Sequence, residues 1–227
     1  MTLSFMILLY KIKYKHYVRV KLMKNEKPYR KKGEKTKQKL FVSAAELFNQ
    51  YDFNEVTVDS IVEAAGVAKG TFYIYFESKD ALIAAFISDY VSKVDTDYRA
   101  FLETYPPDTT ATKMLMGLIG KIADTLSDII GYASMRTVYK LMMTDTIDLS
   151  AIKGFNRELY QMFVDVLERG TERGEFNPTF SLNELSQHFV IAIRGLSYEW
   201  CIRYPLFALK AQALSHFQIL LDGIKVR

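Results

Sequence analysis

Apolar residues recur at intervals of three and four along most of the chain, with polar residues between them. This spacing places them on one face of a helix, because an α-helix completes a turn in 3.6 residues. The stripes are Leu40, Phe41, Ala44, Leu47, Phe48 and Tyr51; Ile61, Val62 and Ala65; Leu82, Ala85, Phe86 and Tyr90; Met114, Leu115, Leu118, Ile119, Ile122 and Leu126; Met135, Val138, Tyr139 and Met142; Ile152, Phe155, Leu159, Phe163, Val166 and Leu167; and Leu209, Ala213, Phe217, Leu220 and Ile224. Because no strand-rich segment follows residue 33, the pattern predicts an all-α fold.

Local signals divide these stripes into separate helices. Pro106 and Pro107 lack the amide hydrogen that a helix needs, so they mark the clearest break in the chain. Ser181 and Glu184 have the spacing of a capping box. We therefore predict a long helix over about 181–203 and a last helix over about 206–225.

The stretch from Thr57 to Lys79 contains two short helical patterns separated by one glycine. Thr57 can cap the first helix by accepting a hydrogen bond from an amide of its first turn. Gly66 can end that helix, because glycine adopts the left-handed conformation of a C-cap at little cost. Two helices joined by a short glycine-containing turn form a helix-turn-helix, whose second helix enters the major groove of DNA.

The second helix, about residues 68–76, has two different faces. Phe72 and Phe76 are four residues apart, so they are expected to face a core. Gly70 lets a DNA backbone approach closely, and Thr71 can contact a base edge or a thymine methyl. Hydroxyl and ammonium groups on the flanks can reach phosphates. The outward and flanking residues are Lys69, Gly70, Thr71, Tyr73, Ile74 and Tyr75.

The segment AAGVAKGTFYIYFESKDAL resembles the signature of the TetR family of bacterial transcriptional regulators, in which AGVxxGTxYxxF precedes a lysine and an acidic residue. The resemblance runs without a gap from Thr57 to Leu82. It departs at Ala68, where the family often has Ser, and at Tyr75, where His is frequent. Lys79 is either a solvated residue at a helix start or, as the resemblance implies, a phosphate contact. The predicted DNA-binding residues are Thr57, Lys69, Gly70, Thr71, Tyr73, Tyr75 and Lys79.

Charge is distributed unevenly along the chain. Residues 1–40 contain 13 Lys or Arg against Glu26 and Glu34, a net charge of +11, which leaves −7 for the rest of a chain whose formal charge is +4. A basic front suits DNA, and it would also suit an anionic membrane. Residues 1–33 are interpreted as a basic extension. They are either an arm that follows the DNA or the product of a start upstream of the native one at Met23.

Residues 34–80 are predicted to form a three-helix DNA-binding domain, and residues 81–227 a helical effector-binding and dimerisation domain. The resemblance implies that the last two long helices pair with those of a second subunit as a four-helix bundle. A homodimer of this kind would bind a near-palindromic operator on double-stranded DNA. The interface candidates, each of which could equally be intrachain core, are Leu196, Leu214, Phe217 and Leu221.

The resemblance also implies a repressor whose effector enters among the middle helices and tilts the helix that begins near Ser78. These helices are rich in Met and aromatic residues, which suits a small apolar effector, although such residues also form ordinary helical cores. Arg136 and Arg194 could bind an effector carboxylate or form structural salt bridges. The effector-binding candidates are Tyr139, Met142, Phe163 and Trp200.

Other classes of protein receive little support. Apolar residues make up 49% of the 227 residues, which suffices for a packed core, and a single Cys201 fits a cytoplasmic protein without disulfides. His16, His188 and His216 lie far apart and form no metal-ligand pattern, so neither a metal nor a cofactor is predicted.

Catalysis and membrane insertion are not expected either. Ser150 and Lys153 match the S-x-x-K pattern of penicillin-recognising enzymes, but their other two motifs are missing, so we predict no enzyme. The apolar segment from Leu3 to Tyr10 is too short to span a bilayer, so no integral membrane association is expected. The alternative function is a membrane-surface or scaffolding helical protein that uses its basic N-terminus.

Overall fold

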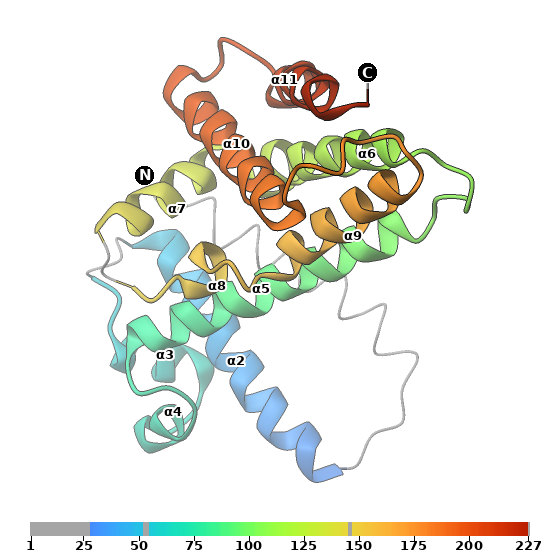
Figure 1. Cartoon of the computed structure of the whole chain (residues 1–227). Helices are drawn as coiled ribbons and strands as arrows, with labels where there is room; N and C mark the ends of the chain where they lie inside the picture. Colours follow the sequence, from blue (N-terminus) through green and yellow to red (C-terminus); the bar gives the residue numbers. More distant parts are fainter. Residues whose placement is uncertain (1–27, 52–54, 145–146, 227) are drawn as a thin grey trace. The chain divides into compact units, whose positions relative to one another are not determined.

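The computed structural model describes residues 28–51, 55–144 and 147–226, and these ranges confirm the predicted all-α fold (Figure 1). Their one extended pairing is an isolated bridge between Phe176 and Lys225. None of the helices described is both long and apolar enough to cross a lipid bilayer. The elements are α2 (Pro28–Gln50), α3 (Val58–Ala65), α4 (Lys69–Tyr75), α5 (Lys79–Leu102), α6 (Ala111–Asp124), a π-helix η1 (Thr125–Ile130), α7 (Tyr132–Thr144), α8 (Ser150–Lys153), α9 (Glu158–Glu172), α10 (Leu182–Arg203) and α11 (Leu209–Ile224).

The helices form two compact units. The first spans the described residues up to Ile87 together with Ala133–Leu149, and the second spans Ser88–Tyr132 and Ser150–Arg227. The first unit therefore contains the predicted helix-turn-helix, the first turns of α5 and most of α7. The predicted division of the chain after residue 80 stays a prediction.

A cluster of phenylalanine rings forms the core of the first unit. The ring of Phe41 in α2 lies 5.3 Å from that of Phe76 and 5.2 Å from that of Phe86 in α5. Phe72 in α4 is fully buried, and its ring lies 5.7 Å from that of Phe76. Aromatic pairs of this kind contribute about 0.5–1.5 kcal/mol each beyond their burial. The rings thus hold α2, α4 and α5 together; the side chain of Phe48, predicted for the same core, lies outside the part that the structure describes.

Helix α2 begins at Pro28, two turns before the start expected near Thr36. Proline is favoured at the first position of a helix, because the amide hydrogen that it lacks would have no partner there. The lysine-rich tract from Pro28 onward is therefore helical.

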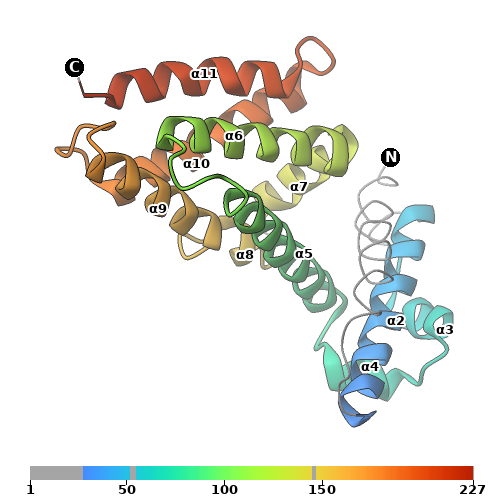
Figure 2. The ribbon, with the colours of Figure 1, turned by 90° about the vertical axis from the view of Figure 1, so that its right-hand side faces the viewer.

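The second unit is built around the four helices α6, α9, α10 and α11. Helix α6 packs against both α9 and α11, and α9 packs against α10. Figure 2 shows α11 lying along α6. The buried rings of Phe163 (α9), Phe189 (α10) and Phe217 (α11) meet edge to face, with centroid distances of 5.6 Å and 5.3 Å. These contacts join the three helices in the interior.

Polar contacts fix the ends of helices in this unit. Arg157, just before α9, donates hydrogen bonds to both carboxylate oxygens of Asp95 in α5, and the two side chains are only 16% and 4% exposed. Glu175 accepts hydrogen bonds of 2.8 Å and 3.1 Å from the amides of Ala111 and Thr112, which caps α6. Loss of one partner from a buried ion pair leaves an uncompensated charge, so we expect the Asp95–Arg157 pair to be important for stability.

The predicted helix through Ile152 and Phe155 is wrong. Helix α8 ends at Lys153, α9 begins at Glu158, and Phe155 lies exposed between them. The cause is Gly154, whose amide donates a 2.7 Å hydrogen bond to the Ser150 carbonyl and closes the turn. A Cβ at residue 154 would lie 2.8 Å from the backbone carbonyl oxygen of Ser150, so the local path of the chain depends on glycine.

Candidate nucleic-acid interface and ligand cavity

The turn between α3 and α4 has the geometry expected of a helix-turn-helix. Thr57 accepts a 3.1 Å hydrogen bond from the Ser60 amide, and the Ser60 hydroxyl oxygen accepts one from the Thr57 amide, so the pair forms a capping box. Gly66 has φ 63° and ψ 41°, and its amide and that of Val67 bond to carbonyls of the last turn of α3. Only glycine adopts this conformation readily, so the turn confirms the sequence-based prediction.

Helix α4 is short and two-sided. Phe72 is fully buried and Phe76, directly after the helix, is nearly so, whereas Tyr73 is 51% and Ile74 77% exposed. A methyl group at Gly70 would contact nothing within 4 Å. The buried rings therefore fix the rotation of the helix, and the opposite face stays open to solvent.

Lys69, at the start of α4, is paired within the chain. Its ammonium group lies 2.7 Å from a carboxylate oxygen of Asp59 in α3, and both side chains are more than half exposed. The hydrogen bond and the charge of Asp59 raise the pKa of Lys69 above its ordinary value. Lys69 is thus positively charged at neutral pH and held toward α3. A phosphate would have to share it with Asp59 or displace Asp59.

Lys79 also makes a contact that the sequence does not reveal. Its ammonium group donates a 2.9 Å hydrogen bond to the carbonyl of Val56, which precedes α3. Partial burial lowers the pKa of Lys79. The residue therefore ties the start of α5 to the start of the helix-turn-helix, and a contact with phosphate would be additional to this role.

Two further residues extend this surface onto α2. Tyr75 is half-buried and lies close to Gly33 of α2. A Cβ atom added at Gly33 would be 3.4 Å from the Tyr75 hydroxyl oxygen. Lys37, which the sequence-based prediction missed, places its ammonium group 5.6 Å from the ring centroid of Phe41 and 5.7 Å from that of Phe76. The i, i+4 spacing of Lys37 and Phe41 is the signal that could have found it. A cation is thereby held beside the end of α4.

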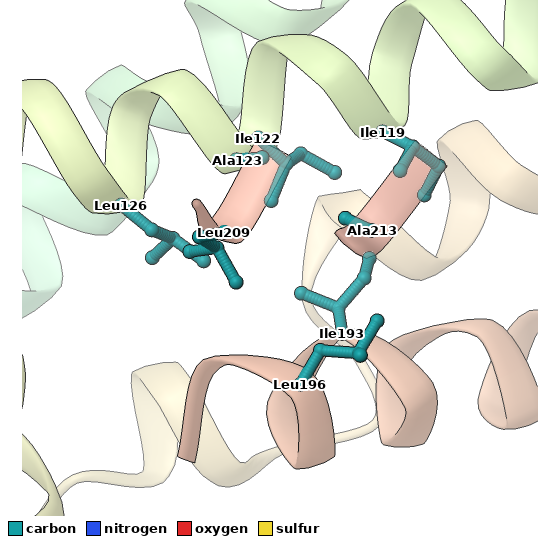
Figure 3. Close-up of a pocket in the computed structure, with 8 residues that line it drawn as sticks. All are labelled: Ile119, Ile122, Ala123, Leu126, Ile193, Leu196, Leu209 and Ala213. Carbon is teal, nitrogen blue, oxygen red and sulfur yellow. The ribbon is translucent and has the colours of Figure 1, made fainter. Parts of the chain in front are cut away.

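A small aliphatic cavity lies in the second unit between α6, η1, α10 and α11 (Figure 3). Its open space is about 10 Å³, which is room for about one water molecule. The π-helical turn η1 contributes Leu126, and the Thr125 hydroxyl beside it donates to the Lys121 carbonyl. The lining side chains carry no polar atom: Ile119, Ile122, Ala123, Leu126, Ile193, Leu196, Leu209 and Ala213.

Comparison with known proteins agrees with this geometry. Residues 40–86 match the model of bacterial regulatory proteins of the tetR family. The chain is 24% identical over 167 residues to the transcriptional repressor KstR2 of Mycolicibacterium smegmatis. The aligned region covers 72% of this chain and 78% of that protein.

Residues 40–86 are a DNA-binding segment of the TetR family. Two solved structures of transcriptional regulators share the fold of this chain. The first is Thermus thermophilus FadR in complex with lauroyl-CoA, with a TM-score of 0.62, 23% identity and coverage of 84% of this chain and 96% of that one. The second is Bacillus subtilis FadR in complex with stearoyl-CoA, with a TM-score of 0.65, 18% identity and coverage of 82% and 98%. The matched segment supports a TetR-family transcriptional regulator.

The structure of this TetR-family regulator separates the four predicted effector residues. Tyr139 and Met142 are half-buried in α7 of the first unit. Phe163 and Trp200 are buried in the second unit, where Phe163 contacts Phe189 and Trp200 packs edge-on against the rings of Tyr132 and Tyr204. None of the four lines the aliphatic cavity, and their part in effector binding stays a prediction.

The predicted interface residues occupy different environments. Phe217 and Leu221 are fully buried within the single chain. Leu196 lines the aliphatic cavity. Leu214 lies beside Gly120 of α6, where an added Cβ atom would be 3.8 Å from the Leu214 side chain. The exposed apolar side chains of the same two helices are others, namely Ile191, Tyr198, Ile202 and Ile219. Their role in dimerisation, like that of the predicted residues, remains to be tested.

The remaining candidates are placed as follows. Arg194 donates a hydrogen bond to the carbonyl of Ile152, which is neither an effector carboxylate nor an acidic side chain. The side chain of Arg136 is exposed. His16 lies outside the described residues. Within the ranges that the structure describes, no group of three or more His, Cys, Asp or Glu side chains could hold a metal ion.

Proposed function

We propose that this regulator is a cytoplasmic repressor that binds a near-palindromic operator as a homodimer and is released by a small apolar effector. The proposal rests on helix α4, which has one buried face and one exposed face. Two buried rings lock its orientation, while Gly70, Tyr73 and Ile74 are exposed and Thr71 is half-buried. Such a face can enter a major groove with its backbone close to the base edges.

The DNA contacts proposed here come from Thr57, Gly70, Thr71, Tyr73 and Tyr75 and from two lysines. Lys69 and Lys79 lie on either side of the centre of α4, and Asp59 and the Val56 carbonyl hold them there. An ammonium group has three donors, so Lys69 could contact a phosphate while it stays paired with Asp59. Phosphate contacts from the two lysines would position α4, and base contacts from its centre would supply specificity.

A second copy of the chain is the proposed occupant of the exposed face of α10 and α11. Ile191, Ile202 and Ile219 are each more than half exposed on these helices. Beside them an apolar groove of about 370 Å³ runs between the helices, lined by Leu185, His188, Phe189, Ile191, Ala192, His216, Leu220 and Ile224. Burial of these side chains against the same face of a partner would remove apolar surface from water. Changing Ile191 and Ile219 to Asp should shift the chain toward monomer in sedimentation equilibrium.

The aliphatic cavity is the proposed entry point for the apolar part of the effector. Its lining suits a hydrocarbon chain, and two proteins of the same fold were solved with lauroyl-CoA and stearoyl-CoA. A long acyl chain does not fit into about 10 Å³. Acyl binding would therefore require α6, α10 and α11 to move apart, and the effector would stabilise that arrangement. A coupling of about 1–3 kcal/mol would weaken operator binding about 5- to 150-fold.

A mobility-shift experiment tests this function. The full chain is mixed with DNA from upstream of its own coding region in rising salt, without and with lauroyl-CoA or stearoyl-CoA. We expect two-fold-symmetric protection, a steep loss of affinity with salt, and release by the acyl thioesters but not by coenzyme A alone. A monomer with no DNA selectivity that binds anionic vesicles would instead favour the membrane-surface alternative.

A matched pair of variants locates the effector. Ala213→Val narrows the cavity and should abolish release by lauroyl-CoA while operator binding is kept. Ala211→Val adds the same methyl groups at an exposed position of the same helix and should respond as wild type does. Equal release of both variants would reject the cavity as the effector site.

A further inference from the structure

Ile74 is an exposed aliphatic residue in the middle of the proposed DNA-reading helix. Its side chain is 77% exposed, a value matched only by Leu206 among the large apolar side chains of the described residues. The buried rings of Phe72 and Phe76 prevent α4 from rotating to hide it. The exposed isoleucine is therefore available for an apolar contact outside the monomer.

The helix surface beside Ile74 is open. Gly70 lies four residues before Ile74 and Thr71 three, so these residues share one face of the helix. A methyl group at Gly70 would meet nothing within 4 Å, which leaves the space beside Ile74 open. Isoleucine is stiff at its first side-chain torsion within a helix, so its methyl groups are held in place before DNA binds.

The chemistry of the major groove limits what Ile74 can contact there. Base edges in this groove present hydrogen-bond donors and acceptors, and their one apolar group is the C5 methyl of thymine. An isoleucine side chain can neither donate nor accept a hydrogen bond. Against any other base edge it would remove water from a polar group without replacing the lost hydrogen bond, which is unfavourable.

We propose that Ile74 is a specificity-determining residue that reads the C5 methyl of one thymine in each half of the operator. This inference rests on the proposed function and deepens it, because it names the chemical group that α4 selects. Thr71 and Tyr73 would then supply polar contacts on either side of an apolar centre.

Removal of single methyl groups from DNA tests the proposal. The full wild-type chain first selects an operator from a pool of random duplexes. Each thymine of that operator is then replaced by deoxyuridine, in one half-site or in both. At one symmetric pair of positions we expect about fourfold weaker binding per half-site and about fifteenfold when both are changed, the effect of one buried methyl group. At the same positions, 5-methylcytosine should bind more tightly than cytosine.

Three variants assign the effect to Ile74. Ile74→Ala should bind the thymine and deoxyuridine operators equally, because its methyl group no longer reaches the base. Ile74→Val keeps the β-branched shape and should retain most of the discrimination. Leu206→Ala removes an equally exposed side chain outside the helix-turn-helix and should discriminate as wild type does. Thermal unfolding of each variant confirms that it is folded.

Two outcomes would overturn the proposal. The first is a wild-type chain that binds its selected operator equally well after every thymine replacement. The second is an Ile74→Ala chain that keeps the wild-type preference for thymine. Either result leaves the DNA-binding function intact, whereas a chain that selects no sequence from the pool would reject the proposed function as well.

Discussion

The helix-turn-helix and the second helical unit obey the same packing rules, yet they differ in how closely residue type is tied to position. In the helix-turn-helix, Thr57 caps a helix, Gly66 adopts a positive φ, and Phe72 fills the core, each within a span of 16 residues. In the second unit, the core of Phe163, Phe189 and Phe217 is assembled from three helices distant in sequence. A short motif with a fixed backbone restricts the residues it accepts, whereas a helical core accepts many apolar residues of suitable total volume.

Truncation of one core ring in each unit should separate the two regions most clearly. Phe72→Ala and Phe163→Ala each remove a fully buried ring, so each should lower the free energy of unfolding by about 3–5 kcal/mol. Phe72→Ala should abolish operator binding and leave the dimer intact. Phe163→Ala should make the second unit unfold at a lower denaturant concentration than the first. Denaturant unfolding, sedimentation and mobility shift on both variants measure this, and identical profiles would contradict independent roles for the two units.

The buried ion pair of the second unit should give the next largest effect. Asp95→Ala leaves Arg157 without its carboxylate partner and should lower the free energy of unfolding by about 3 kcal/mol. The double variant Asp95→Ala with Arg157→Met removes the stranded charge and should recover part of that loss. Chemical denaturation checks both variants. A double variant less stable than Asp95→Ala alone would show that the guanidinium has other essential contacts.

Two glycines of the helix-turn-helix should respond in opposite directions. Gly66→Ala forces a side chain into a positive φ and should lower the free energy of unfolding by about 1–2 kcal/mol. Gly70→Ala occupies open space within a helix and should raise it by about 0.5–1 kcal/mol, while weakening operator binding by obstructing close approach. Thermal unfolding and mobility shift separate the two effects. A Gly70→Ala chain with unchanged operator affinity would exclude a close backbone approach at this position.

The smallest effect on stability is expected at the Lys69–Asp59 pair. Both side chains are exposed, so Lys69→Ala should change the free energy of unfolding by less than about 1 kcal/mol. It should nevertheless weaken DNA binding and reduce the slope of log affinity against log salt by about 0.9 for each half-site contact. Asp59→Asn frees the same lysine and should bind DNA more tightly. An unchanged salt slope in Lys69→Ala would remove this residue from the phosphate contacts.

The sequence by itself determined the all-α fold, the two helices of the motif, the caps of α3 and the side of α4 that is buried. Each of these depends on residues within about four positions of one another. Thr57 bonds to an amide three residues away, and Phe72 and Phe76 share a face because the helix repeats every 3.6 residues. The local signals were accordingly sufficient for the helix-turn-helix and for the orientation of α4.

Only the tertiary structure decided which distant groups meet. It paired Lys69 with Asp59, tied Lys79 to the Val56 carbonyl, and brought Leu196 to the aliphatic cavity. It also buried Phe217 within the single chain and interrupted the helix expected through Phe155. A stripe of apolar residues shows that a helix has a buried face, but the partner of that face depends on how several helices pack at once. Contacts of this kind have no periodic signal in the sequence.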